Sequence, residues 1–156
     1  MKITSSMEYA TRLIVTLARD HGQAALSAER LSESENVPSD YVNQLLLRLK
    51  RAGLVSSQRG SSGGYALSRS PEDISLGQVL RAVEGTIFED VCGKYSDGRK
   101  DCHHQGSCSI TPVWQKLGAL IEQYFDSITL AQLLDEKPGA CGKVEAMLSR
   151  IPMTNI

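Results

Sequence analysis

The sequence predicts a mainly α-helical fold: a winged helix-turn-helix domain with a small two-stranded wing, followed by a long dimerisation helix. Two short helices separated by the turn Asn36-Val37-Pro38 are typical of a helix-turn-helix. A glycine-rich stretch between two short apolar runs follows directly and predicts a β-hairpin. A wide apolar helix after Thr111-Pro112 predicts a surface that meets a second copy of the chain.

Length and composition fit a soluble globular chain of 156 residues, with one domain or one small domain plus an appendage. Residues 1–70 hold nine Lys and Arg against six Asp and Glu, and residues 71–156 hold eight against twelve. This asymmetry fits a nucleic-acid surface confined to the N-terminal half. The sequence shows neither a membrane-length apolar run nor the apolar core of a signal peptide, so we expect a cytoplasmic protein without a membrane partner.

Helical periodicity and capping residues place the first three helices. Ser5 or Ser6 is expected to cap the first helix and Ser27 the second. In the third helix, apolar residues recur at i, i+3, i+4 and i+7, which leaves a polar outer face. The expected ranges are 4–20, 27–35 and 39–52.

The expected wing consists of strands Val55–Gln58 and Tyr65–Leu67, joined by a loop rich in glycine and serine. Glycines in this loop permit close approach of the backbone to a phosphate chain, and Arg59 at its base could enter a narrow minor groove. The alternative is a flexible hairpin tip in which Arg59 is only a solvated charge.

Three further helices are expected in the second half of the chain. A capping box at Ser75 opens one that ends at Gly85, and Thr129 caps a last short one, Leu130–Asp135. Between them, Thr111 is expected to cap the long helix, with Pro112 at its first position. The expected divisions are the DNA-binding domain 1–84, a cysteine loop 85–110, the dimerisation and short helices 111–135, and a tail 136–156.

Apolar residues cover more than one stripe of the long helix. One side can pack on its own domain while the other meets a second copy, which predicts a homodimer. The alternative is a helix central to a monomeric core. The apolar positions are Val113, Trp114, Leu117, Ala119, Leu120, Ile121, Tyr124 and Phe125.

Three of the four cysteines, Cys92, Cys102 and Cys108, share one polar, glycine-containing loop with the spacing C-x9-C-x5-C. Buried structural cysteines usually stand singly among apolar neighbours, so these thiols are interpreted as soft-metal ligands. Zinc held with His103 or His104 is one alternative, although the loop lacks the close C-x2-C pair of many zinc sites. Direct oxidation of cluster-free thiols is another.

In this order, the winged helix, the cysteine loop and the Trp-bearing helix resemble the IscR/Rrf-type family of bacterial transcription regulators over residues 1 to about 135. The resemblance implies a DNA-binding homodimer that holds an iron–sulfur cluster, commonly [2Fe-2S] and in other members [4Fe-4S], and that controls iron–sulfur cluster biogenesis genes. It implies no enzymatic activity, and the sequence contains no catalytic motif. The matching motifs are Met7-Glu-Tyr-Ala10, Tyr41-Val-Asn-Gln-Leu45, Arg51-Ala-Gly-Leu-Val55, Arg59-Gly, Gly63-Gly-Tyr65 and Ile74-Ser-Leu through Val83.

The fourth cluster ligand departs from the family pattern, because Thr111 replaces the frequent histidine three residues after the last cysteine. Some relatives similarly use a carboxylate of the partner's first helix, which makes Glu8 the leading candidate. Glu8 could instead form a surface ion pair with Arg12, four residues further on. The other candidates are His103, His104, Cys141 and Thr111.

The helix that begins at Ser39 is expected to enter the major groove of a duplex DNA operator, with Ser39 itself among the DNA contacts. Asn43 and Gln44 can present a paired donor and acceptor to a base edge, most naturally adenine. Tyr41, Arg48 and Arg51 are expected to hold phosphates, while Arg59 probes the minor groove. A dimer should read two half-sites about one helical turn apart.

Overall fold

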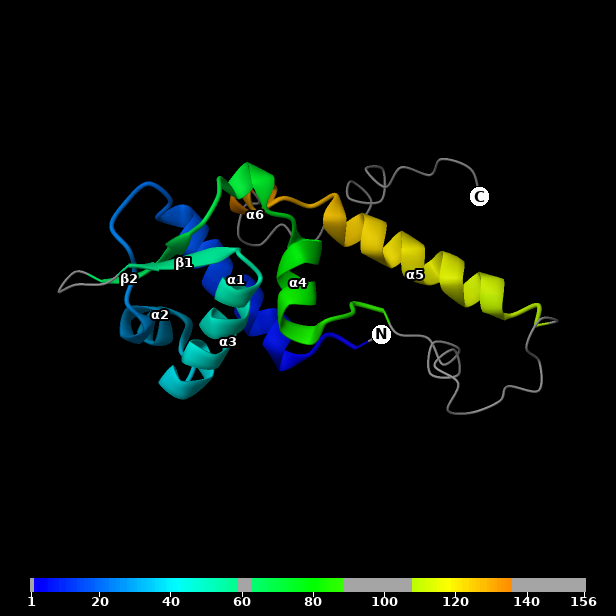
Figure 1. The fold of residues 1–156 in the computed structure, drawn as a ribbon, viewed down its shortest axis with the longest axis horizontal. Helices are drawn as coiled ribbons and strands as arrows, with labels where there is room; N and C mark the ends of the chain where they lie inside the picture. Colours follow the sequence, from blue (N-terminus) through cyan, green and yellow to red (C-terminus); the bar gives the residue numbers. More distant parts are fainter. Residues whose placement is uncertain (1, 59–62, 89–107, 136–156) are drawn as a thin grey trace.

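The structure of the chain, a computed structural model, describes residues 2–58, 63–88 and 108–135 (Figure 1). It is mainly helical with one two-stranded antiparallel sheet, which confirms the predicted fold class. Its elements are α1 (Ser5–Arg19), α2 (Ala28–Glu35), α3 (Ser39–Arg51), β1 (Val55–Gln58), β2 (Gly64–Leu67), the 3-10 helix η1 (Pro71–Asp73), α4 (Leu76–Glu84), α5 (Thr111–Asp126) and α6 (Leu130–Asp135).

Helix α1 is the centre of the fold and contacts α2, α3, α4, α6 and β2. Its inward stripe is buried, because residues at helical spacing turn to the same side of the helix; the stripe consists of Met7, Ala10, Leu13, Ile14 and Leu17. The other α-helices add buried residues to this core except α5, whose only buried residue is Gly118 and whose half-buried Ile121 and Phe125 pack against the core. The largest fully buried side chains are Leu13, Ile14, Leu31, Leu45, Leu46, Leu49, Leu54, Ile74 and Leu130.

The turn between α2 and α3 is the predicted helix-turn-helix turn. Asn36 ends α2 in the left-handed conformation at φ 52°, which asparagine adopts more readily than most residues. Val37 is buried, and its amide donates to the Ser32 carbonyl at 3.1 Å. Pro38 occupies the N-cap position of α3, where its missing donor costs no helical hydrogen bond.

The wing is a hairpin in which Val55 pairs with Leu67 and Gln58 with Gly64. The segment ahead of α2 joins the wing through an isolated antiparallel bridge, because Leu26 and Tyr65 exchange both backbone hydrogen bonds, at 3.0 and 2.8 Å. A Cβ at Gly64 would stand 2.5 Å from the Leu26 carbonyl oxygen, so this approach requires glycine. The wing tip with Arg59 lies outside the described residues.

Two backbone hydrogen bonds join the chain after α5 to the start of α4. The Leu76 amide donates to Ile128 at 2.7 Å, and the Leu130 amide donates to Ile74 at 2.9 Å. The predicted capping box is present, with reciprocal hydrogen bonds between Ser75 and Gln78. The end of α5 is therefore fixed to the winged-helix domain.

Two helix starts differ from the sequence prediction. Thr4, rather than Ser5 or Ser6, caps α1: its backbone is extended, and its hydroxyl accepts from the Met7 amide at 3.2 Å. Helix α5 already includes Thr111, and Ile110 holds the N-cap position without a side-chain hydrogen bond. The predicted Thr111 cap was wrong because the helix begins one residue earlier than expected.

Thr4→Ala is expected to lower the free energy of unfolding by about 1 kcal/mol, the usual contribution of an N-cap hydroxyl. The hydroxyl also donates to Glu84 at the end of α4, at 2.6 Å. Ser5→Ala is the matched control, because exposed Ser5 has no cap hydrogen bond and should change stability by less than about 0.5 kcal/mol. Urea titration followed by circular dichroism measures both, and equal losses would contradict the Thr4 assignment.

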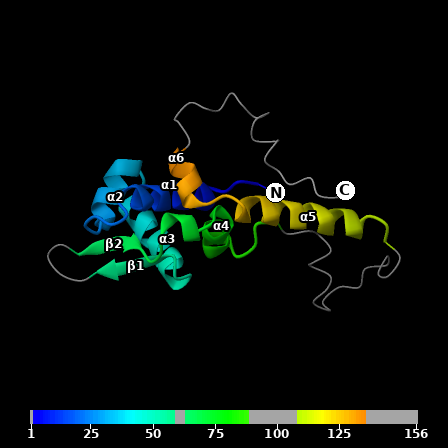
Figure 2. The same ribbon diagram turned by 90° about the horizontal axis from the view of Figure 1, so that it is seen from above.

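Helix α5 projects from the body of the fold (Figures 1 and 2). Both views place the wing and the N-terminal end of α5 at opposite ends of the molecule. Within the described ranges, no helix has the length and apolar character needed to cross a membrane.

Candidate functional site

The outward face of α3 is exposed and, apart from Leu47, polar. Its inward face is fixed by four buried apolar residues, so the remaining positions turn to solvent. Ser39, Asn43, Gln44 and Arg51, all predicted DNA contacts, are exposed there. These four residues are therefore accessible on α3, a helix that contacts β1 of the wing.

Tyr41 and Arg48 lie on the flanks of α3 and have partners inside the domain. The Tyr41 hydroxyl is 2.9 Å from the Ser6 hydroxyl, and its ring meets the Tyr9 ring edge-on at 6.0 Å. Arg48 Nη1 donates to the Val83 carbonyl at 2.7 Å, which joins α3 to the end of α4. Their contact with phosphates stays a prediction, and the structure gives both a positioning role.

Arg81 joins α4 to α5 through two carboxylates of α5. Its guanidinium donates to Asp126 and Glu122, and these partners raise its pKa, the hydrogen bond to Asp126 being the largest cause. A Cβ at Gly77 would collide with Asp126, so the small residue makes room for this pairing. The sequence analysis missed Arg81, because its partners stand 41 and 45 positions away in the chain.

Cys108 lies just before α5, where backbone amides are free to donate. The Thr111 hydroxyl is the main cause that lowers the pKa of the Cys108 thiol, followed by the amides of Thr111 and Ile110. Donors of this kind favour the thiolate, which is the form that binds metals. The position of Cys108 at the start of the long helix is therefore compatible with its predicted role as a metal ligand, which stays a prediction.

The other candidate ligands, Cys92, Cys102, His103, His104 and Cys141, lie outside the described residues, as does Arg59. Within residues 2–58, 63–88 and 108–135, no three His, Cys, Asp or Glu side chains are grouped closely enough to hold a metal ion. Any site that uses Cys108 therefore draws further ligands from the undescribed residues or from a second copy.

Glu8 is exposed on α1 and forms the surface ion pair that the sequence allowed. Arg12 Nη2 lies 2.7 Å from Glu8 Oε1, and Arg12 Nε donates to the same oxygen at 2.9 Å. Each side chain of the pair is 51% exposed. An exposed i, i+4 pair contributes only about 0.3–0.5 kcal/mol, so Glu8 is free to take another partner at little cost.

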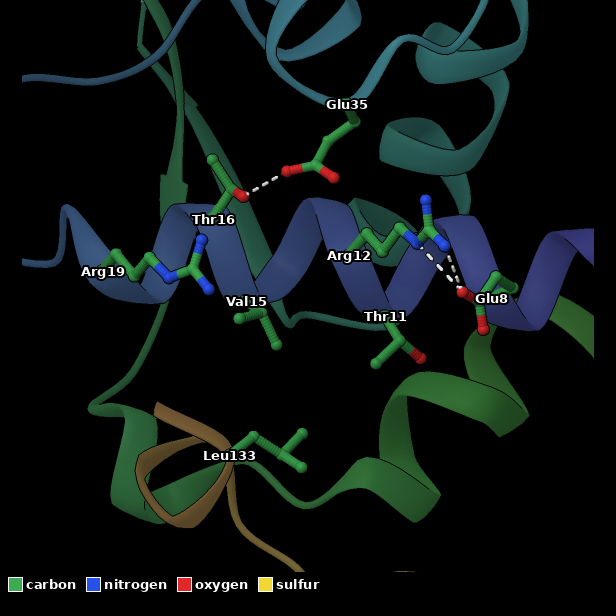
Figure 3. A pocket seen from close by; sticks show the side chains of 8 residues that line it. All are labelled: Glu8, Thr11, Arg12, Val15, Thr16, Arg19, Glu35 and Leu133. Atoms are coloured by element: carbon green, nitrogen blue, oxygen red, sulfur yellow. Dashed lines mark hydrogen bonds and ion pairs between the residues drawn. The ribbon is translucent and has the colours of Figure 1, made fainter. Parts of the chain in front are cut away.

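Glu8 also stands at one end of a pocket of about 270 Å³ along α1 (Figure 3). Val15 points toward Leu133 of α6 across it, while Thr16 donates to Glu35 at 2.6 Å. The hollow is therefore apolar on one side and charged on the other. Its lining consists of Glu8, Thr11, Arg12, Val15, Thr16, Arg19, Glu35 and Leu133.

The exposed apolar residues of α5 form one face of the helix. Val113, Trp114, Leu117 and Leu120 are 59, 44, 39 and 43% exposed, and Ile110 extends the row. A second side of the helix packs on the domain, where a Cβ at Gly118 would overlap the Phe88 ring. In this structure α5 is thus not the centre of a monomeric core, and its apolar face has no partner among the described residues.

A helix-turn-helix with a wing, a free recognition helix and a long projecting helix define a DNA-binding transcription regulator. A family model described as an iron-dependent transcriptional regulator, Rrf2, matches residues 3–136. The chain belongs to the Rrf2 family. Its members are DNA-binding transcription regulators and not enzymes, and this assignment confirms the resemblance found in the sequence.

Individual relatives agree with the family assignment. The transcriptional regulator IscR of Vibrio atlanticus is 32% identical, over 87% of this chain and 76% of the relative. The solved structure of IscR from T. potens has a TM-score of 0.65 at 32% identity and covers 86% of this chain and 87% of its own. CymR, the global cysteine regulator of B. subtilis, has a TM-score of 0.71 at 27% identity, over 86% and 97%.

Proposed function

We propose that the chain is a homodimeric regulator that switches promoter binding in response to iron–sulfur or redox status. Each subunit would hold a [2Fe-2S] cluster with Cys92, Cys102 and Cys108, and Glu8 of the opposite subunit would complete the ligand set. The expected targets are promoters of iron–sulfur cluster biogenesis genes. A [4Fe-4S] cluster and zinc are the alternative occupants.

The observation that carries this proposal is the position of Cys108. Its sulfur lies at the start of α5 beside hydrogen-bond donors that lower the pKa of its thiol, and the exposed apolar face of the same helix has no partner among the described residues. One helix thus joins the cysteine loop to the surface on which a second copy would pack. Four thiolate or carboxylate donors suit an iron–sulfur cluster, which would supply redox chemistry when bound.

The position of Glu8 supports its proposed role as the fourth cluster ligand, supplied by the opposite subunit. Its carboxylate is exposed at the edge of the α1 pocket, and its ion pair with Arg12 is weak. Ligation would tie α1 of one subunit to the cysteine loop of the other. Because α1 contacts α3 and β2, such a tie would fix the angle between the two DNA-reading surfaces of the dimer.

A cluster-free thiol sensor is the second candidate. The lowered pKa of Cys108 also favours direct oxidation of the thiolate. A solved relative, CymR of Staphylococcus aureus in an oxidized form, is 29% identical with a TM-score of 0.67 and covers 88% of this chain and 98% of its own. Thiol oxidation is therefore a physical rival to cluster binding.

Anaerobic purification with iron, sulfide and zinc analysis separates these functions. Brown protein with about two iron and two sulfide per subunit supports the [2Fe-2S] cluster. Colourless protein with titratable thiols supports the thiol sensor, while stoichiometric zinc supports the structural metal. Salt-dependent binding to duplex DNA, measured on each form, tests the promoter switch.

Glu8→Ala is expected to leave the fold intact and to alter the absorption spectrum and shorten the oxygen lifetime of the cluster, because one of its four ligands is lost. Arg12→Ala is the matched control, since it removes the same ion pair and keeps the carboxylate. If both variants match the wild type in spectrum and lifetime, Glu8 is not the ligand.

A further inference from the structure

Leu47 is an exposed apolar residue in the middle of the outward face of α3. It is 46% exposed, whereas Leu45, Leu46 and Leu49 of the same helix are buried. A single exposed leucine is common on protein surfaces and needs no explanation by itself. The position of this one matters because the face around it is otherwise polar.

The flanks of α3 are occupied, which leaves the strip around Leu47 to meet DNA. On the α1 and α4 side, Tyr41 contacts Ser6, and Arg48 donates to Val83. On the wing side, Lys50 donates to the Ser57 hydroxyl at 2.6 Å. The strip between them holds Asn43 and Gln44 one turn before Leu47, and Arg51 one turn after it.

We propose that Leu47 reads a thymine methyl group in the major groove. The C5-methyl of thymine is the only apolar group that base edges present there. Leu47 can bury its own methyl groups against it. Cytosine in that position presents a bare C5 beside an amino donor, so the contact is lost and a polar edge meets a leucine.

The contact gives Leu47 a defined place in recognition. Four residues of helix span roughly 6 Å, so Leu47 lies between the base reached by Asn43 or Gln44 and the backbone reached by Arg51. It would therefore specify a thymine next to the adenine proposed for the amide pair. The inference deepens the DNA-binding function and does not depend on the cluster.

The test begins with duplexes selected from a random pool by the wild-type protein. Each thymine of the selected operator is then replaced by deoxyuridine, which removes only the methyl group. At one symmetry-related pair of positions, affinity of the wild type should fall about fourfold per methyl, the ratio expected for one buried methyl group. Leu47→Ala should bind thymine and deoxyuridine duplexes equally, whereas Leu47→Met should keep the difference.

Ile3→Ala is the matched control, because Ile3 is 52% exposed but lies outside α3. Ile3→Ala should prefer thymine duplexes over deoxyuridine duplexes by the same factor as the wild type. Measurement at low salt keeps the weaker complexes resolvable, because phosphate contacts strengthen there. The inference is overturned if no deoxyuridine substitution lowers the affinity of the wild type by more than about twofold. It is also overturned if Leu47→Ala loses as much affinity as the wild type on replacement of thymine by deoxyuridine. A pool without any enriched sequence would instead overturn sequence-specific DNA binding itself.

Discussion

Leu117→Glu should convert the proposed homodimer into monomers and weaken operator binding by more than about 100-fold. Leu117 is central in the exposed apolar row of α5, and a symmetric interface would bury two copies of the new charge. An unpaired buried carboxylate costs several kcal/mol, which exceeds what loss of one leucine contact would cost. A monomer contacts only one half-site of the operator, so the binding energy of the second half-site is lost.

Gln123→Glu provides the control, because it adds the same charge to an exposed position on the polar side of α5. It should leave the mass unchanged. Light scattering after size-exclusion chromatography gives the mass, and fluorescence anisotropy with a two-half-site duplex gives the affinity. A Leu117→Glu protein that remains a dimer would show that this face of α5 is not the interface.

Cys108→Ala should reduce bound iron in anaerobically purified protein to below about 10% of the wild-type content. One of the three proposed thiolate ligands is removed, and it is the one whose pKa is lowered by the Thr111 hydroxyl and by the amides of Thr111 and Ile110. The fold should persist, since Cys108 is partly exposed and outside the core cluster. Iron and sulfide analysis with far-ultraviolet circular dichroism measures both effects.

Ser109→Ala is a neighbouring control that should retain the cluster, because Ser109 is exposed beside the cysteine. Full iron content in Cys108→Ala would remove this cysteine from the ligand set. If zinc rather than iron falls in the variant, the loop holds a structural zinc, and the redox mechanism is wrong.

Local patterns were enough to predict most of the elements. Apolar periodicity gave α1 and α3, the Asn36-Val37-Pro38 turn separated α2 from α3, and the capping box gave the start of α4. These signals act within a few residues, so the sequence contains them in full. Even so, they misplaced two helix starts by one residue, because Thr4 and Ser5 are both acceptable caps and only the backbone dihedrals distinguish them.

The predicted DNA contacts of α3 fall into two groups in the structure: residues with partners inside the domain and residues without such partners among the described residues. From sequence, Tyr41 and Arg48 were as available as Asn43 and Gln44. In the structure the first two meet Ser6 and Val83, residues brought close only by packing. The pairing of Arg81 with carboxylates of α5 follows the same pattern, since nothing local to α4 indicates it.

The sequence by itself determined the winged helix-turn-helix, the cysteine loop ahead of a long apolar helix and the membership of the chain in its family. The winged helix-turn-helix rests on turn chemistry, capping and helical period, the cysteine loop on the spacing of its cysteines, and the family on short matching motifs, all of which are properties of neighbouring residues. Only the tertiary structure decided which face of α3 stays free and which side of α5 is left apolar and exposed. Exposure depends on what other elements cover, and contacts between residues far apart in the chain have no local signature.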